Sequence, residues 1–266
     1  MSDPSRPPAP LALVLGTGDI ASAIGWHLHR AGHAVLLLRD PAVPVLRRGM
    51  AFDDAIEAGE AVLDGVTALA GERPDHRHIS VTRGHLAVVL GALPFPALLV
   101  DARLRKYAEP EELRPLAARA IGIGPGFTAG QQVHVAVETL PGAEGRVLVQ
   151  GATAGPSGQA VPLGGAGSER FVHAAHPGTW VPLRAPGDAV AAGAVLGHLG
   201  GAPVAAPLAG IVRGLVRARP GLPRGTKLAE IDPRPDAPWQ GIPPRAARIA
   251  LGVLAALQAV QGVAAE

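Results

Sequence analysis

The amino-acid sequence predicts an α/β fold: a parallel sheet in the N-terminal part, then a β-rich unit and a C-terminal helix. Three observations support this prediction. Apolar residues Leu11 to Leu15 run directly into a glycine turn and the start of a helix. After about Gly142, short β-like runs separated by Gly and Pro replace the alternation of strands and helices. The chain closes with a long run of strong helix formers.

Length and composition agree with more than one structural unit. The chain has 266 residues, 48% of them hydrophobic, which is ample for one large core or two smaller ones. We expect four parts: a Pro-rich disordered tail at 1–10, a Rossmann-like domain at 11–140, a β-rich domain at 141–235 and a C-terminal helix at 236–266.

Composition also excludes several classes of function. The chain has no cysteine, so it forms no disulfide, thiolate metal site or persulfide. A formal charge of only +2 and an aromatic content of 3% do not predict a nucleic-acid-binding surface. The N-terminus lacks a signal-peptide pattern and no apolar run reaches the roughly 18 residues of a membrane span, which predicts a cytoplasmic protein with no membrane partner. His76 and His78 have no third ligand at a convincing spacing, so no metal site is expected.

The opening stretch has the pattern of a dinucleotide-binding turn. Gly16, Thr17 and Gly18 follow the apolar run, and the residues from Ile20 to His33 have amphipathic helical character, with Gly32 well placed to end the helix. In such turns the glycines let the backbone approach a phosphate group, which binds at the N-terminus of the helix. The four residues from Gly16 to Asp19 are therefore candidate cofactor-binding residues.

A second strand, His33–Leu38, ends at Arg39 and Asp40. An acid at this place binds ribose hydroxyls, whereas an arginine suits a 2′-phosphate. Three interpretations stay open: Asp40 binds ribose, Arg39 binds phosphate, or both side chains are solvated. The doublet Arg47 and Arg48, which precedes a predicted short helix in DDAIEAG, is likewise either solvated or an anion clamp, because guanidinium groups bind phosphate in bidentate fashion.

Further strands are predicted at His85–Leu90 and Ala97–Val100, followed by a helical stretch in PEELRPLAARA. Asp101 and Arg103 come directly after the second of these strands, where open α/β sheets bind ligands. Asp101 either serves the ligand or pairs with a neighbouring arginine such as Arg103 or Arg105.

The stretch IGIGPGFTAGQQVHVAVET holds a second glycine-rich segment. Gly122, Gly124, Gly126 and Gly130 permit tight turns and close approach of N–H groups to an anion, and Thr128 adds a hydroxyl. The segment is not a P-loop, because the Gly-Lys-Ser/Thr ending is missing, and a plain glycine-rich hairpin is the alternative.

Alternating valines follow this segment, which predicts a strand that places His134 and Glu138 on one face. These two side chains form either an acid/base pair or a structural contact.

The β-rich part contains a weak internal repeat, in which GAVLGHL at 193–199 is echoed by GTKLAEI at 225–231. From about Arg184 to Asp232 the pattern resembles the barrel-sandwich fold of biotinyl and lipoyl carrier domains. The hairpin between the copies, GHLGGAPVAAP, lacks the lysine that those carriers modify, so the resemblance implies the scaffold without the swinging arm. In the last segment, an apolar stripe should pack on the N-terminal domain or on a partner; its members are Ile249, Val253, Leu254, Leu257 and Val260.

Six segments together resemble the selenium-dependent molybdenum hydroxylase accessory family, bacterial proteins related to xanthine dehydrogenase accessory factors. They are GTGDIA, VLRRGMAFDDAIEAGEAVLDGVTA, LLVDARLRK, GIGPGFTAGQQVHVAVET, GIVRGL and KLAEIDPR, in collinear order over nearly the whole chain. The residues to which the resemblance assigns functional roles are Gly16, Gly18, Asp19, Arg47, Arg48, Asp101, Arg103, Gly124, Gly126, Phe127, Gly130, His134, Glu138 and Thr139.

The sequence departs from the pattern of this family at three places. Leu15 and Gly16-Thr17 stand where the family has an arginine and a small residue, Arg39 stands near the place of an acid, and Pro156–Gly158 replaces a turn like Asn-Thr-Gly. The change at Arg39 argues against ordinary ribose recognition.

These observations lead to three hypotheses. The first is an accessory or maturation factor that binds molybdenum cofactor, as molybdopterin or its nucleotide form, for a molybdenum hydroxylase client. The second is an NAD(P)-dependent oxidoreductase, which only the first glycine turn supports. The third is a non-catalytic adaptor whose β-rich unit docks a client hydroxylase. Catalysis and homo-oligomerisation stay open, and the candidate catalytic residues are Asp101, His134 and Glu138.

Overall fold

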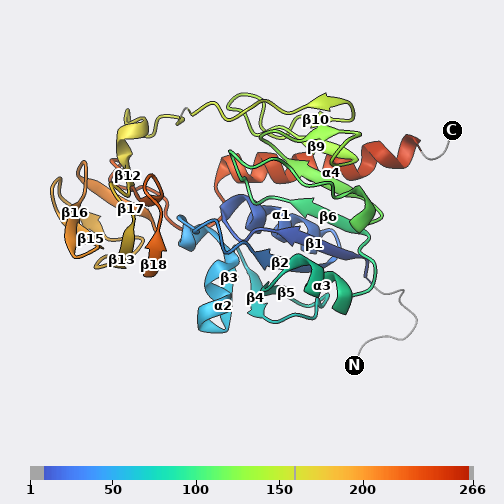
Figure 1. Cartoon of the computed structure of the whole chain (residues 1–266), viewed down its shortest axis with the longest axis horizontal. Helices are drawn as coiled ribbons and strands as arrows, with labels where there is room; N and C mark the ends of the chain where they lie inside the picture. The colour runs from blue at the N-terminus through green and yellow to red at the C-terminus, as the bar shows by residue number, and fades with distance from the viewer. Residues whose placement is uncertain (1–8, 159, 264–266) are drawn as a thin grey trace. The chain divides into compact units, whose positions relative to one another are not determined.

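The computed structural model describes residues 9–158 and 160–263, and side chains only as far as residue 258. Residues 1–8, most of the predicted disordered tail, lie outside the described residues, as does the side chain of Val260. The chain forms two compact units (Figure 1). Unit 1 contains the residues up to Pro41, Phe52–Ser157 and those from Ile242; unit 2 contains Ala42–Ala51 and Gly158–Gly241.

Unit 1 is built on a nine-stranded sheet with the order β10-β9-β7-β6-β1-β2-β5-β4-β3. Neighbouring strands from β9 to β4 are parallel, and the edge strands β10 and β3 are antiparallel. The strands of this sheet are β1 Leu11–Leu15, β2 Ala34–Arg39, β3 Glu60–Leu63, β4 Val66–Ala70, β5 Ile79–Arg83, β6 Leu98–Asp101, β7 Ala120–Ile123, β9 Val135–Val137 and β10 Val147–Leu148. A short separate pair joins β8 Thr128–Ala129 to β11 Gly151–Ala152. The mixed α/β class that the sequence predicts is confirmed.

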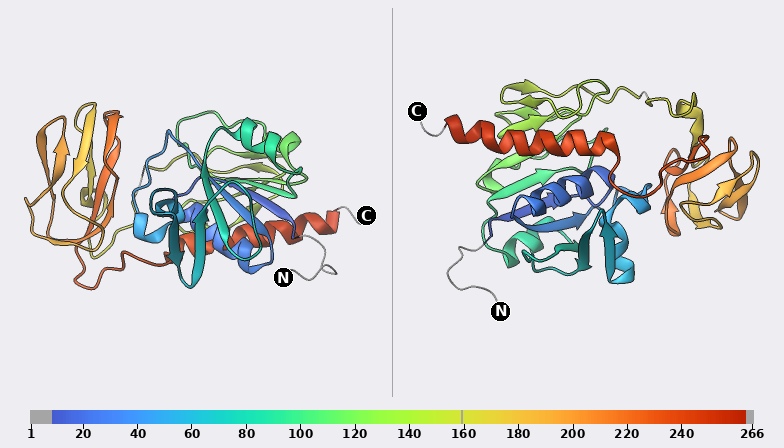
Figure 2. Two further views of the ribbon diagram at one scale, coloured as in Figure 1. Left: turned by 90° about the horizontal axis from the view of Figure 1, so that it is seen from below. Right: turned by 180° about the vertical axis from the view of Figure 1, so that it is seen from behind.

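Helices cover both faces of this sheet. The helices α1 Asp19–Arg30 and α4 Pro244–Val263 lie side by side on one face, and α3 Leu86–Ala92 lies on the other (Figure 2). Alternate strand residues point to the two faces, as pleated strands require. On one face, the strand residues Ala12, Val14, Val35, Leu37 and Val100 pack against Ile20, Ile24 and Leu28 of α1 and Ile249 and Val253 of α4. The face under α3 contains Leu13, Leu15, Leu36, Leu38, Leu99 and Val89.

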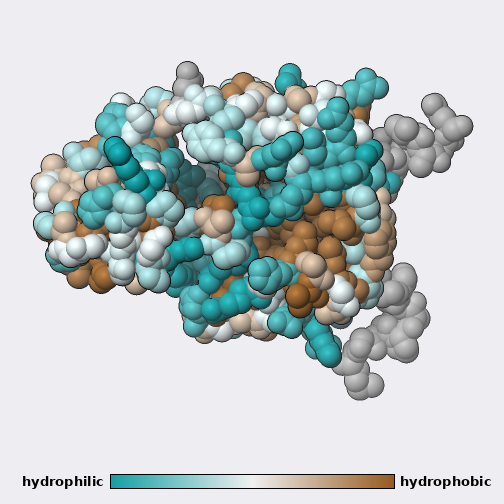
Figure 3. Space-filling view, in the orientation of Figure 1, coloured by the Kyte–Doolittle hydropathy of each residue, from teal (hydrophilic) through white to brown (hydrophobic). Residues whose placement is uncertain are grey.

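The face that carries α3 is less completely covered. Apolar side chains gather on its surface (Figure 3), and two large ones near α3 are mostly exposed, Val88 at 68% and Phe95 at 66%. Within the part of the chain that the structure describes, no helix combines the length and the apolar character that crossing a membrane requires.

Two predicted elements of unit 1 are wrong. Residues 86–92 form α3, with His85 at its N-cap, where a strand at His85–Leu90 is expected. The stretch PEELRPLAARA contains only a 3₁₀ turn, Arg114–Leu116, because Pro115 in its interior lacks the N–H group that an α-helix needs there. The short helix in DDAIEAG is confirmed as a 3₁₀ turn, Phe52–Asp54, that leads into α2, Ala55–Ala58.

Unit 2 consists of two four-stranded antiparallel sheets. One sheet has the order β12-β19-β17-β14, with β12 Phe171–His173, β19 Lys227–Asp232, β17 Gly210–Leu215 and β14 Ala189–Val190. The other has the order β16-β15-β13-β18, with β16 Ala202–Ala205, β15 Val195–Leu199, β13 Gly178–Pro182 and β18 Arg219–Leu222. Both sheets contribute to one apolar core that includes the fully buried Trp180. Residues 141–157, which the sequence analysis groups with the β-rich domain, lie in unit 1, and residues 42–51 join unit 2.

Candidate functional site

One edge of the unit 1 sheet gathers most of the predicted site residues. In the parallel strands β1, β6 and β7, Leu15 pairs with Asp101 and Asp101 with Gly122, so the three strands end side by side. The segments that follow them are the first glycine turn, residues 101–103 and the second glycine-rich segment. The carboxyl ends of parallel strands are where α/β sheets bind ligands.

The glycine turn between β1 and α1 has one position where only glycine fits and one position that is open. Gly16 has φ of +110°, and a Cβ there would lie 2.9 Å from the carbonyl oxygen of Ala102. Gly18, the N-cap of α1, makes no side-chain cap, and a Cβ there would meet no atom within 4 Å. Space is therefore open beside the N-cap of this 12-residue helix.

The middle residue of this turn, Thr17, forms a hydrogen bond with a buried carboxylate. The Thr17 hydroxyl donates to Asp53 Oδ1 at 2.5 Å, and Asp53 is only 3% exposed. Arg39 Nε and Nη2 each donate to the same carboxylate at 2.8 Å, and Arg39 Nη1 donates to Glu57 at 2.6 Å. Burial works to lower the pKa of Arg39, but the contacts with Asp53 and Glu57 outweigh burial and raise it. The guanidinium predicted to meet a cofactor phosphate is thus bound to two carboxylates.

A second chain of ion pairs follows the end of β6. Arg103 donates from Nε to both oxygens of Asp101, at 3.0 and 3.1 Å, and from Nη2 to Oδ2 at 2.5 Å. Arg105 Nε donates to Asp40 Oδ2 at 2.6 Å, and Glu111 contacts both arginines. Of the alternatives for Asp101, the structure shows the pairing with Arg103; for Asp40, it shows an ion pair with Arg105.

Arg103, Arg105 and the acids Asp101, Glu109 and Glu111 line a narrow cleft at the same edge of the sheet. Its other walls include Ile123, Pro125 and Phe127, and its volume is about 20 Å³, little more than one water molecule needs. The second glycine-rich segment therefore reaches the site through Pro125 and Phe127, whereas Gly130 closes a turn on Val133. The Phe127 ring packs where a Cβ on Gly122 would stand, which explains the glycine at that position.

His134 and Glu138 are at opposite ends of β9. The three residues of β9 lie between them, and four steps of about 3.3 Å along an extended strand place their Cα atoms about 13 Å apart, so they do not form an acid/base pair. The His134 Nδ1 atom accepts the Ala120 N–H, and burial together with Arg114 and Arg119 lowers the pKa of its ring. The Glu138 carboxylate is 1% exposed and accepts three backbone N–H groups, from Thr139, Leu140 and Ala154.

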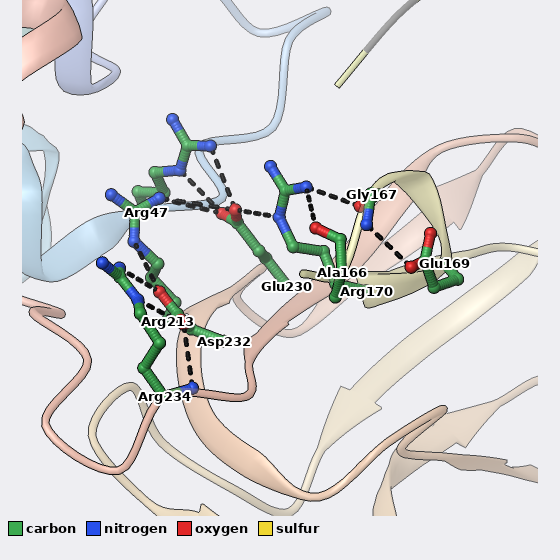
Figure 4. A network of polar contacts seen from close by, with 9 residues as sticks. All are labelled: Arg47, Ala166, Gly167, Glu169, Arg170, Arg213, Glu230, Asp232 and Arg234. Carbon is green, nitrogen blue, oxygen red and sulfur yellow. Dashed lines mark hydrogen bonds and ion pairs between the residues drawn. The ribbon is translucent and has the colours of Figure 1, made fainter. Parts of the chain in front are cut away.

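Arg47 and Arg48 belong to unit 2 and have partners there. The Arg47 Nε atom donates to Glu230 Oε2 at 2.7 Å, and the Arg48 Nε atom donates to the carbonyl oxygen of Leu215 at 2.9 Å. Arg170 and Arg213 approach the same Glu230 carboxylate at 3.1 and 3.4 Å. Figure 4 shows the guanidinium groups converging on Glu230.

The acids of this cluster lie on one strand. Glu230 and Asp232 are both 0% exposed, and Arg234 binds Asp232 at 2.6 Å. Burial works to raise the pKa of Glu230, but the charge of Arg47 and the contacts with Arg213 and Arg170 lower it to about 2. This cluster was not among the predicted site residues, although two acids at alternate positions of an apolar strand signal buried cationic partners. Among the described residues, no group of three or more histidine or carboxylate side chains can hold a metal ion.

Comparisons with known proteins give one close sequence relative. No family model matches the chain. The uncharacterized protein YqeB of Escherichia coli (strain K12) is 32% identical over an alignment of 278 positions, which covers 100% of this chain and 51% of YqeB. The chain thus spans about half the length of this curated relative.

Two solved structures show remote likeness. The ectoine utilization protein EutE (DoeB) from Ruegeria pomeroyi is 14% identical, with 85% of this chain and 86% of that chain covered and a TM-score of 0.25. The succinylglutamate desuccinylase/aspartoacylase from Rhodobacter sphaeroides is 15% identical, with 86% and 87% covered and a TM-score of 0.26. Scores this low carry no argument about fold or function.

Proposed function

We propose that unit 1 binds a phosphate-bearing molybdenum cofactor, molybdopterin or its nucleotide form, and that the chain is an accessory or maturation factor for a molybdenum hydroxylase. The observation that carries the proposal is the position of the Gly16–Gly18 turn. It lies beside Ala102 and Arg103, at the point of the sheet where β1 has β2 on one side and β6 on the other.

The strand order supports a Rossmann-like interpretation of unit 1. Read along the parallel strands, the order is β4-β5-β2-β1-β6-β7-β9, and the six strands from β5 to β9 have the arrangement of a doubly wound sheet made of two halves, with β4 added at one end. Ligands of such sheets bind where the order reverses, here between β1 and β6. The open space at Gly18, in front of the α1 N-terminus, suits a phosphate group there.

The contacts of Arg39 and Asp40 argue against NAD(P) as the ligand. Arg39 would have to leave Asp53 and Glu57 to bind a 2′-phosphate, and Asp40 would have to leave Arg105 to bind ribose. Neither side chain offers the recognition on which an NAD(P) enzyme depends. The choice of molybdopterin itself rests on the resemblance of the six sequence segments.

For unit 2 we propose the barrel-sandwich scaffold without a carrier function. Two four-stranded sheets around one core support this interpretation. The β15–β16 hairpin turns at Gly200 and Gly201 and offers no lysine to modify. The ammonium group of Lys227 lies 3.7 Å from the centre of the Phe171 ring, as a cation–π contact. A scaffold of this kind suits docking of a client hydroxylase.

Anaerobic calorimetry with molybdopterin tests the cofactor proposal. We expect binding by the wild-type chain and loss of binding in Gly18→Val, because the added side chain would fill the open space without meeting another atom. Gly71→Val is the matched control: Gly71 is also in unit 1, and its Cβ position is equally open. Absence of binding to any pterin species, or equal binding by both variants, would overturn the proposal; an NADH or NADPH fluorescence change would favour the oxidoreductase instead.

A further inference from the structure

The two arginines of the cleft already share a bound carboxylate. Glu111 Oε2 lies 3.3 Å from Arg103 Nη2, and Glu111 Oε1 lies 3.4 Å from Arg105 Nη1. One carboxylate thus bridges two guanidinium groups, each of which has further N–H donors. This is the geometry in which arginines bind phosphate oxygens.

Three carboxylates pair with Arg103 and Arg105, and of these only Glu111 is open to solvent. The side chains of Asp40 and Asp101 are 2% and 5% exposed, whereas that of Glu111 is 52% exposed. The two buried acids hold the arginines from behind through contacts of 2.5 to 2.6 Å, shorter than those of Glu111. Of the three carboxylates paired with Arg103 and Arg105, Glu111 has the longest contacts and the greatest exposure, so it is the most readily exchanged.

The backbone between the arginines is strained. Leu104 has φ of +54°, and in the part of the chain that the structure describes only Asp64, in the tight turn between β3 and β4, is another non-glycine residue with positive φ. A leucine in the left-handed region is unfavourable and persists only where its surroundings demand it. Here the turn at Leu104 lets residues 103 and 105 both reach Glu111.

We propose that Arg103 and Arg105 form the subsite for a phosphate or diphosphate group of the ligand, and that Glu111 occupies this subsite until the ligand displaces it. The inference rests on the proposed location of the cofactor site but adds the ligand class that the site selects, an anion with more charge than one carboxylate. Because the cleft has little free volume, ligand entry requires Glu111 to leave. Arg105, absent from the predicted site, becomes a binding residue.

Calorimetry with inorganic pyrophosphate tests the subsite directly. Glu111→Gln keeps the size of the side chain and removes its charge, so we expect pyrophosphate to bind about three- to tenfold more tightly than to the wild-type chain. Glu112→Gln is the matched control, since Glu112 pairs with Arg114 and has no contact with Arg103 or Arg105 among those described. Arg105→Gln should weaken pyrophosphate binding and cancel the gain from Glu111→Gln in the double variant.

The outcomes separate this inference from the proposed function. Equal pyrophosphate affinity of Glu111→Gln, Glu112→Gln and the wild-type chain, or no pyrophosphate binding by any of them, would overturn the subsite. If molybdopterin still binds in a Gly18-dependent manner, the proposed function would stand without it. If Glu111→Gln tightens pyrophosphate binding while no pterin binds, the anion subsite stands and the cofactor proposal fails.

Discussion

The two units use the same pair of chemical groups, arginine and carboxylate, for opposite purposes. In unit 1 the buried Asp53 and Asp101 also pair with arginines, but the side chains of Arg105 and Glu111 are 34% and 52% exposed. In unit 2 the carboxylates of Glu230 and Asp232 are fully buried, and Arg170 is 3% exposed. Both Glu111 and Glu230 pair with arginines, but only Glu111 is open to solvent. Exposure therefore distinguishes a carboxylate that a ligand can displace from one that stabilises the fold.

The energetic consequences differ in the same way. An exposed ion pair contributes about 0 to 1 kcal/mol, whereas removal of one member of a buried pair leaves an uncompensated charge and costs about 3–5 kcal/mol. The Arg47–Arg48 doublet illustrates the point. Its sequence suits an anion clamp, yet Arg47 meets a carboxylate of its own chain, Glu230.

The largest effect is expected from Glu230→Gln. The variant leaves Arg47, Arg170 and Arg213 around a neutral amide, so the free energy of unfolding of unit 2 should fall by about 3–5 kcal/mol. Urea denaturation followed by the fluorescence of the buried Trp180, in a background where the other two tryptophans are phenylalanine, measures it. Glu112→Gln provides the baseline, and a loss below about 1 kcal/mol would show that the cluster is not structural.

The pH dependence of unit 2 stability should be the next largest effect. The pKa of Glu230 is about 2 in the folded chain and close to 4.5 when unfolded, so its contribution is complete above pH 4.5 and is lost as the pH falls toward 2. The difference corresponds to about 3 kcal/mol. Denaturation of wild-type and Glu230→Gln chains between pH 2 and 6 should give stabilities that converge at the acid end; a constant gap would contradict the assignment.

An intermediate effect is expected from Glu138→Gln. The amide replaces one oxygen that accepts backbone N–H groups, so a donor then faces a donor and the free energy of unfolding of unit 1 should fall by about 1–3 kcal/mol. Hydrogen exchange of the Thr139 and Ala154 amides locates the loss. Full stability with reduced ligand turnover would instead restore Glu138 as a catalytic candidate.

The smallest effect is expected from Glu111→Gln on stability. Because Glu111 is half exposed and its two contacts are longer than 3.2 Å, the change should stay within about 1 kcal/mol. Thermal unfolding of the variant beside Glu112→Gln measures the difference. A loss as large as that of Glu230→Gln would erase the contrast between the two units.

The sequence predicts those parts of the fold that depend on local patterns. The strand, glycine turn, helix and second strand of residues 11–39 are confirmed, because apolar periodicity and the glycines specify them within a few residues. The apolar run at 86–92 is ambiguous between strand and helix by periodicity alone, and it folds as α3. The hairpin of β3 and β4, and strand β5, were not among the predicted elements.

The candidate site is predicted only in part, because its partners are distant in sequence. Asp101 and Arg103 can be found at the end of a strand, but the contact of Arg105 with Asp40 joins residues 65 positions apart. The contact of Arg47 with Glu230 joins residues 183 positions apart, and no local pattern reveals it. Exposure, which separates the two kinds of ion pair, is a property of the folded chain.

The place of α4 in the chain has a consequence for synthesis on the ribosome. α4 packs beside α1 and covers its apolar residues, and Gly252 of α4 packs closely on Gly145 in the loop between β9 and β10. Residues 158–241, which belong to unit 2, are made before it. Residues 31–243 separate α1 from α4. At about 5–20 residues per second, the apolar face of α1 is therefore without α4 for roughly 11–43 s, an interval in which a nascent chain is open to chaperones and to aggregation.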